Sequence, residues 1–125
     1  MQFSGPFSLE FAGEREWLLT NGLGGYASST LCGMNTRRYH GLLVAALKPP
    51  AARTLLVSKL EEVLNNGSTD YPLATNAYPG TIHPEGYHWL RSVTLEPDAV
   101  LQRFGAGGAE LEKRIAMVQG ENTTR

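Results

Sequence analysis

Short apolar runs follow one another along this chain, and glycine, proline or asparagine separates most of them from the next. The longest lies within Tyr39–Leu47, and its continuity predicts a strand that is buried on both faces. Pro49-Pro50 ends this run, because proline cannot donate a hydrogen bond to a strand ladder. Further strands are predicted over Glu16–Thr20, Tyr26–Cys32, Arg53–Lys59, Tyr87–Leu95, Val100–Phe104 and Glu110–Val118.

Turn signals connect these runs. Asn21-Gly22 is typical of a tight turn, and Gly105–Gly108 joins the last two strands into a hairpin. Leu60–Asn65 has apolar residues at helical spacing, but the Asn-Gly chemistry that follows favours a hairpin with a return strand over Tyr71–Thr75. The alternating Phe3, Phe7, Leu9 and Phe11 of residues 1–13 predict an edge strand or an extended arm, and residues 76–86 predict a loop. The pattern as a whole predicts an antiparallel all-β sandwich.

Composition narrows the functional classes. The 125 residues suffice for one domain, and the eleven basic and twelve acidic residues give no electrostatic reason to expect nucleic acid or an anionic membrane as a partner. No apolar run approaches the roughly 20 residues of a membrane helix. Residues 1–6 lack the pattern of a secretory signal. The single cysteine, Cys32, excludes an internal disulfide and favours a reducing compartment, so we expect a cytoplasmic protein.

Two neighbouring segments carry the candidate chemistry. Gly22–Ala27 fits a dinucleotide-binding glycine pattern, but the residues after it are poor helix formers, so a tight turn is the simpler interpretation. Arg37–His40 combines two guanidinium groups, which are planar hydrogen-bond donors, with the hydroxyl of a tyrosine. In an extended chain Arg37 and Tyr39 would share one face, and Arg38 and His40 the other. The segment could bind a ligand, or its arginines could pair with carboxylates such as those of Glu61 and Glu62.

The remaining candidates indicate no reactive centre. The spacing of His40, His83 and His88 matches no zinc pattern, and neither a metal nor a cofactor is predicted. Tyr87 and Trp89 could stack on a sugar ring, although aromatic residues in strands are more often core. Cys32 has no activating partner in the sequence and is predicted to be buried. Adjacent glutamates on a strand point to opposite faces, so Glu61-Glu62 is not a glycosidase carboxylate pair.

Two sequence stretches are more distinctive than composition. E-W-L-L-T-N-G-L-G-G-Y-A-S-S-T occupies Glu16–Thr30, and N-T-R-R-Y-H-G-L-L-V-A-A occupies Asn35–Ala46. Both closely resemble the N-terminal domain of the glycogen debranching enzymes of bacterial and archaeal type. Leu55–Glu62, Tyr78–Tyr87 and Leu111–Thr123 are also similar to this family. The resemblance therefore covers almost the whole chain, and T-R-R-Y-H-G-L-L within an N-G-x-G-G-Y context is its most specific part.

The resemblance implies a β-sandwich of the supersandwich kind that precedes an (α/α)6 barrel. The parent would be an amylo-α-1,6-glucosidase that hydrolyses the branch points of glycogen or related α-glucans. Its catalytic acid and base are expected in the barrel, so this chain is assigned no catalytic residue. The barrel is absent here, and we expect an incomplete sandwich, a domain of residues 1–125 that does not hydrolyse glycans alone.

The resemblance also suggests a role for the polar segment. Arg37, Arg38, Tyr39 and His40, with Asn21 of the glycine-rich turn, are expected to help shape the glucan site where the sandwich meets the barrel. The segment could instead only hold the two domains together. Two other hypotheses remain: a stand-alone α-glucan-binding domain, and an interaction protein whose exposed apolar seam forms homo-oligomers.

Overall fold

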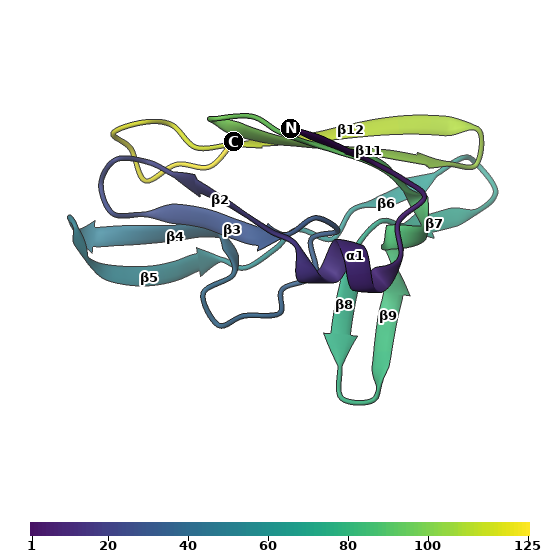
Figure 1. Ribbon diagram of the computed structural model, residues 1–125, viewed down its shortest axis with the longest axis horizontal. Coiled ribbons are helices and arrows are strands. Elements are labelled where there is room, and N and C mark those ends of the chain that lie inside the picture. The colour runs from purple at the N-terminus through teal and green to yellow at the C-terminus, as the bar shows by residue number, and fades with distance from the viewer.

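The structure, a computed structural model that describes residues 1–125, is an antiparallel all-β sandwich (Figure 1). One four-stranded sheet has the order β1-β10-β11-β12, and the other has the order β2-β3-β4-β5. The strands of the first sheet are β1 (Gln2–Ser4), β10 (Leu90–Leu95), β11 (Ala99–Ala106) and β12 (Ala109–Ala116). Those of the second are β2 (Glu16–Thr20), β3 (Tyr26–Thr30), β4 (Gly41–Lys48) and β5 (Ala51–Val57).

Two hairpins and two short helices complete the fold. The hairpins pair β6 (Val63–Asn65) with β7 (Asp70–Pro72), and β8 (Thr75–Tyr78) with β9 (Thr81–Glu85). The β8–β9 hairpin projects away from both sheets (Figure 1). The helices are α1 (Leu9–Glu14) and the 3-10 turn η1 (Gly86–Trp89). Neither helix has the length or the apolar character needed to cross a bilayer.

The core lies between the two sheets. Trp17 and Leu19 alternate with exposed neighbours along β2, so their side chains point inward while Leu18 points outward. Val93, Val100 and Phe104 of the facing sheet belong to the same buried cluster. β4 is buried from Gly41 to Ala46, apart from the half-buried Leu43, as its continuous apolar pattern predicts. Cys32 is buried in this core, as predicted.

Each predicted strand is present, with bounds that differ from the prediction by at most about three residues, and the Asn-Gly and Gly-Gly signals lie at chain reversals. β2 spans the predicted residues, and β3 ends two residues earlier than expected. The Asn-Gly segment closes the β6–β7 hairpin, which resolves the ambiguity over Leu60–Asn65 in favour of the hairpin. Gly107 and Gly108 both have positive φ and form the turn between β11 and β12.

The prediction for the N-terminal segment is wrong in part. Gln2–Ser4 pairs with β10 as an edge strand, but residues 9–14 form the helix α1. The Ser8 hydroxyl accepts a hydrogen bond from the Phe11 amide at 3.0 Å and caps the helix. The Phe11 ring lies 5.9 Å from the Phe3 ring and 6.0 Å from the Phe7 ring. Packing within this aromatic group therefore outweighs the strand-like alternation of the sequence.

The predicted loop over residues 76–86 is also wrong, because most of it is the β8–β9 hairpin. Tyr78 pairs with Thr81 across Pro79-Gly80, and Gly80 has a φ of 78°. Proline followed by a glycine of positive φ is the chemistry of a type II turn. The strand predicted from Tyr87 begins only at Leu90, since η1 occupies the residues before it.

Candidate functional site

A cluster of polar side chains gathers around Glu16, the first residue of β2. The Tyr39 hydroxyl donates a hydrogen bond to Glu16 Oε1 at 2.7 Å. Nε2 of His40 lies 2.6 Å from the same oxygen, and Arg37 Nε lies 3.8 Å from it. One carboxylate oxygen therefore receives three groups of the segment that precedes β4. We call Glu16, Arg37, Tyr39 and His40 the Glu16 cluster.

The segment reaches Glu16 because it turns. The His40 amide donates to the Arg37 carbonyl at 3.1 Å, which closes a turn over residues 37–40. Nδ1 of His40 accepts hydrogen bonds from the backbone amides of Thr36 at 2.9 Å and Arg37 at 3.1 Å. With Nδ1 occupied as an acceptor, the proton of the neutral ring lies on Nε2, which donates to the Glu16 carboxylate.

This geometry corrects two predictions. Arg37–His40 is not extended, so the expected alternation between two faces does not occur, and Tyr39 and His40 meet at one carboxylate. Glu61 and Glu62 are not the partners of the arginines either. Glu61 accepts from the Asn76 side chain at 2.5 Å, and Glu62 forms an ion pair with Lys113 at 2.5 Å.

The hydrogen bonds of the cluster shift the acidity of two of its members. The pKa of the Glu16 carboxyl is lowered from its usual value of 4.5, first because Tyr39 donates to it and then because His40 and Arg37 supply further favourable interactions. Partial desolvation opposes this shift. The same hydrogen bond raises the pKa of the Tyr39 hydroxyl above 10.0, because losing its proton beside a carboxylate is unfavourable. Glu16 therefore stays ionised and Tyr39 stays a donor at neutral pH.

The predicted site residues differ in accessibility. Arg37, Arg38 and Tyr39 are exposed, and the Arg38 side chain makes no hydrogen bond or ion pair within the chain. The side chain of His40 is fully buried. The turn over residues 37–40 thus presents two guanidinium groups and a tyrosine ring outward from a fixed base.

Asn21 lies at the opposite end of β2 from Glu16 and is fully buried. Its Oδ1 accepts from the amides of Leu23 at 2.9 Å and Gly25 at 3.1 Å. Its Nδ2 donates to the Glu121 carbonyl at 3.2 Å and to Asn122 Oδ1 at 3.1 Å. Asn21 therefore organises the glycine-rich turn and ties it to the C-terminal segment.

Sequence reasoning missed Glu16, the centre of the cluster. It lies more than 20 positions before its partners and begins a strand whose next residues are apolar. Only the antiparallel pairing of β2 with β3 and of β3 with β4 brings it beside Tyr39 and His40. No local signal in the sequence indicates this contact.

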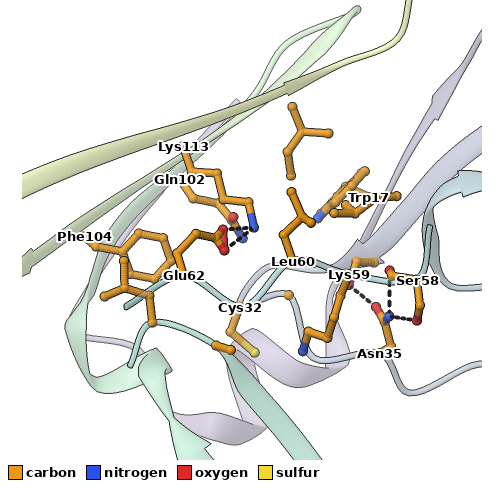
Figure 2. A pocket seen from close by; sticks show the side chains of 16 residues that line it. Trp17, Cys32, Asn35, Ser58, Lys59, Leu60, Glu62, Gln102, Phe104 and Lys113 are labelled. Carbon is orange, nitrogen blue, oxygen red and sulfur yellow. Dashed lines mark hydrogen bonds and ion pairs between the residues drawn. The ribbon is translucent and has the colours of Figure 1, made fainter. Parts of the chain in front are cut away.

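A small cavity lined by both polar and apolar side chains lies between the sheets, and Figure 2 shows these side chains. Its volume of about 30 Å³ has room for about two water molecules. The Glu62–Lys113 ion pair and the Asn35–Ser58 hydrogen bonds lie at its wall (Figure 2). Burial lowers the pKa of Lys59, whose Nζ donates to the Thr75 carbonyl at 2.9 Å. This cavity is too small for a sugar.

Tyr87 and Trp89, the two aromatic residues considered as sugar-stacking candidates, are half-buried and pack against the core. The Tyr87 ring stacks on His88 at 4.3 Å, and the Trp89 ring meets Tyr71 edge-on at 5.1 Å. Nowhere in the chain do three or more His, Cys, Asp or Glu side chains converge in a way that could hold a metal ion.

Strand β5 is unusual because all seven of its residues are exposed. It is the edge strand of its sheet, and Leu55, Leu56 and Val57 expose 48%, 52% and 36% of their surfaces. Asn35 Nδ2 donates to the Ser58 carbonyl at 3.2 Å, so the segment that leads into the Glu16 cluster is fastened to the end of β5. The apolar end of β5 and an exposed polar turn therefore lie at the same end of the sheet.

Comparison with known proteins identifies the family. A family model described as glycogen debranching enzyme N terminal matches residues 15–125, which include the Glu16 cluster, the glycine-rich turn and β5. Neither the curated proteins nor the solved structures contain a match to the chain. The family match covers most of the sandwich and agrees with the resemblance of the two distinctive stretches. The chain belongs to the family of glycogen debranching enzyme N-terminal domains.

Proposed function

We propose that this chain is a non-catalytic module that packs on the catalytic (α/α)6 barrel domain of a glycogen debranching enzyme and helps to shape its glucan site. The observation that carries the proposal is the Glu16 cluster, which fixes an exposed turn of two arginines and a tyrosine beside an uncovered apolar strand. The family assignment supports the choice of parent enzyme and of an α-glucan as the class of substrate.

Strand β5 is the surface that we assign to the catalytic domain. Its exposed Leu55, Leu56 and Val57 carry no charge, and an apolar patch of this kind marks an interaction site. An open strand edge also offers unpaired backbone groups, which natural proteins usually cover or protect with charges. Packing against a second domain would cover this surface.

The turn over residues 37–40 is the part that we assign to the rim of the glucan site. Arg37, Arg38 and Tyr39 are the groups available to touch a glucan, because guanidinium groups donate hydrogen bonds and a tyrosine ring offers an apolar face. His40 and Asn21 contribute by position, since their polar atoms already serve the fold. The substrate would be an α-glucan with α-1,6 branch points.

Substitution Arg38→Ala in the full-length parent enzyme tests the role of the rim. Arg38 has no side-chain partner in this chain, so its removal leaves the Glu16 cluster intact. We expect a rise in KM or a fall in kcat of about tenfold on a branched α-glucan, with an unchanged melting temperature. Arg114→Ala is the matched control, because Arg114 is an exposed arginine on the other sheet whose side chain also makes no hydrogen bond or ion pair within the chain.

The alternative is that the turn only holds the two domains together. In that case Arg38→Ala would lower the melting temperature of the parent and leave its kinetic constants unchanged. This pattern would remove the glucan-site role from the proposal and keep the packing role.

A further inference from the structure

A shallow trough on the outer face of the sheet β2-β3-β4-β5 shares one residue, Tyr39, with the Glu16 cluster. It is lined by three glycines, which we call its floor, and by five larger residues: Gly22, Gly24, Gly25, Leu18, Thr20, Tyr26, Tyr39 and Arg53. It holds about 590 Å³, which lies within the roughly 300–1,000 Å³ of small-molecule sites. Its lining combines aromatic and apolar groups with a single guanidinium group.

The fold requires glycine at two floor positions, because the backbone there approaches neighbouring segments closely. Gly24 has a φ of 96°, and a Cβ there would lie 2.6 Å from the Pro50 carbonyl oxygen. A Cβ on Gly25 would lie 2.6 Å from Asn21 Nδ2 and 2.9 Å from the Val44 carbonyl oxygen. Because the backbone of this turn packs so closely on its neighbours, the position of the floor is fixed.

Arg53 is held in place at the edge of the trough. Its Nε donates to the Gly24 carbonyl at 2.8 Å, and its guanidinium carbon lies 5.9 Å from the centre of the Tyr26 ring. One donor fixes the side chain, and the terminal nitrogens make no other bond within the chain. The Tyr39 ring is fixed in a similar way, through its hydroxyl bond to Glu16. Little rotational freedom would be lost on binding a ligand.

We propose that this trough binds a glucosyl residue of an α-glucan. The apolar C–H face of the sugar would lie against Tyr26 and Tyr39, and adjacent hydroxyls would accept hydrogen bonds from Arg53. The choice of ligand class rests on the proposed function. The location does not, because every residue of the trough belongs to this chain, and its one residue on β5, Arg53, precedes the exposed Leu55–Val57 that are assigned to the catalytic domain.

Isothermal titration of the 125-residue chain with maltoheptaose tests the inference, with cellohexaose as the β-linked control. We expect saturable binding of maltoheptaose and weaker or no binding of cellohexaose. Arg53→Ala removes the donors and should weaken binding at least about tenfold. Thr20→Arg places a long charged side chain on a wall of the trough and should have the same effect. Arg114→Ala on the other sheet should bind as the unchanged chain does.

Thermal melts separate lost binding from lost folding. If Arg53→Ala melts much lower because the Gly24 contact is gone, the surface substitution Thr20→Arg decides the question. Absence of saturable maltoheptaose binding overturns the inference, as does equal binding by the unchanged chain and Thr20→Arg. A trough that serves only as a seat for the catalytic domain would give the first of these results. The effect of Arg38→Ala in the parent enzyme tests the proposed function independently of all these outcomes.

Discussion

Oε1 of Glu16 lies 2.6 Å from Nε2 of His40, and this contact fastens the turn before β4 to the first residue of β2. The opposite ring nitrogen, Nδ1, accepts from two backbone amides of the same turn. The fully buried imidazole thus links the Glu16 carboxylate, through Nε2, to the main chain of the turn, through Nδ1. Its two ends can be removed separately by substitution.

Substituting His40 should show that the Nδ1 end carries more of the stability. His40→Ala leaves the amides of Thr36 and Arg37 without an acceptor and opens a cavity. In His40→Asn the side-chain Oδ1 occupies the position of Nδ1, so only the Glu16 contact is lost. We expect His40→Ala to lower the free energy of unfolding by about 1–3 kcal/mol more than His40→Asn. Urea denaturation of both variants measures the difference, and equal values would contradict the assignment of Nδ1 as the acceptor.

The Glu16 cluster should make the free energy of unfolding depend on pH. The pKa of Glu16 is lowered from 4.5, chiefly by the Tyr39 hydroxyl. The ionised carboxylate is therefore more stable in the folded state than in the unfolded state. The contribution of Glu16 is therefore complete well above pH 4.5, and it is lost as the pH falls through the lower pKa of the folded state.

This dependence can be measured by comparing the unchanged chain with Glu16→Gln. The difference in their free energies of unfolding should be largest near neutral pH and should shrink as the pH falls to about 3. Glu112→Gln, which alters an exposed ion pair with Arg103 on the other sheet, provides the control. A difference that stays constant over this range would show that the Glu16 carboxylate is not stabilised in the folded state.

The strands of the sandwich could be predicted because each carries its own pattern. In β2 the inward Trp17 and Leu19 alternate with outward residues, and in β4 the apolar residues are continuous. These patterns depend on neighbours in sequence. In the same way, asparagine and glycine indicate the tight turns from the local sequence alone. Local information was sufficient for the architecture.

The parts that could not be predicted depend on contacts between distant residues. The bond from Tyr39 to Glu16 spans 23 positions, and neither residue indicates the other. The burial of Asn21 depends on Glu121 and Asn122, about 100 positions away. Helix α1 is a different case, because Ser8 as a cap and Glu10 in the first turn are helix signals that the alternating phenylalanines obscured.

A buried hydrogen bond from a side-chain amide between the two sheets should contribute more to stability than an exposed hydrogen bond of the same kind. Gln102 Nε2 donates to the Leu31 carbonyl at 2.7 Å, and both residues are buried. Gln119 Nε2 donates to the Thr20 carbonyl at 2.6 Å in an exposed position. Methionine keeps the approximate shape of glutamine without its donor.

Gln102→Met should therefore lower the free energy of unfolding by about 1–3 kcal/mol, because the buried Leu31 carbonyl loses its hydrogen-bond donor. Gln119→Met should change it by less than about 0.5 kcal/mol, because water replaces the lost bond. Urea denaturation of the two variants, compared at one pH, checks the contrast. A larger effect at Gln119 would mean that Gln102 does not join the two sheets.

Asn21 should prove to be a stability residue whatever its contribution to a glucan site. Asn66 offers a matched comparison, since its Oδ1 also accepts from amides of its own turn, Ser68 at 3.1 Å and Thr69 at 2.9 Å, but in an exposed position. Asn21→Ala removes two acceptor and two donor bonds from a fully buried site and should lower the free energy of unfolding by about 2–4 kcal/mol. Asn66→Ala should cost less than about 1 kcal/mol, because water can reach the freed amides. If the two variants unfolded at the same urea concentration, the hydrogen bonds of Asn21 would not be what holds the glycine-rich turn.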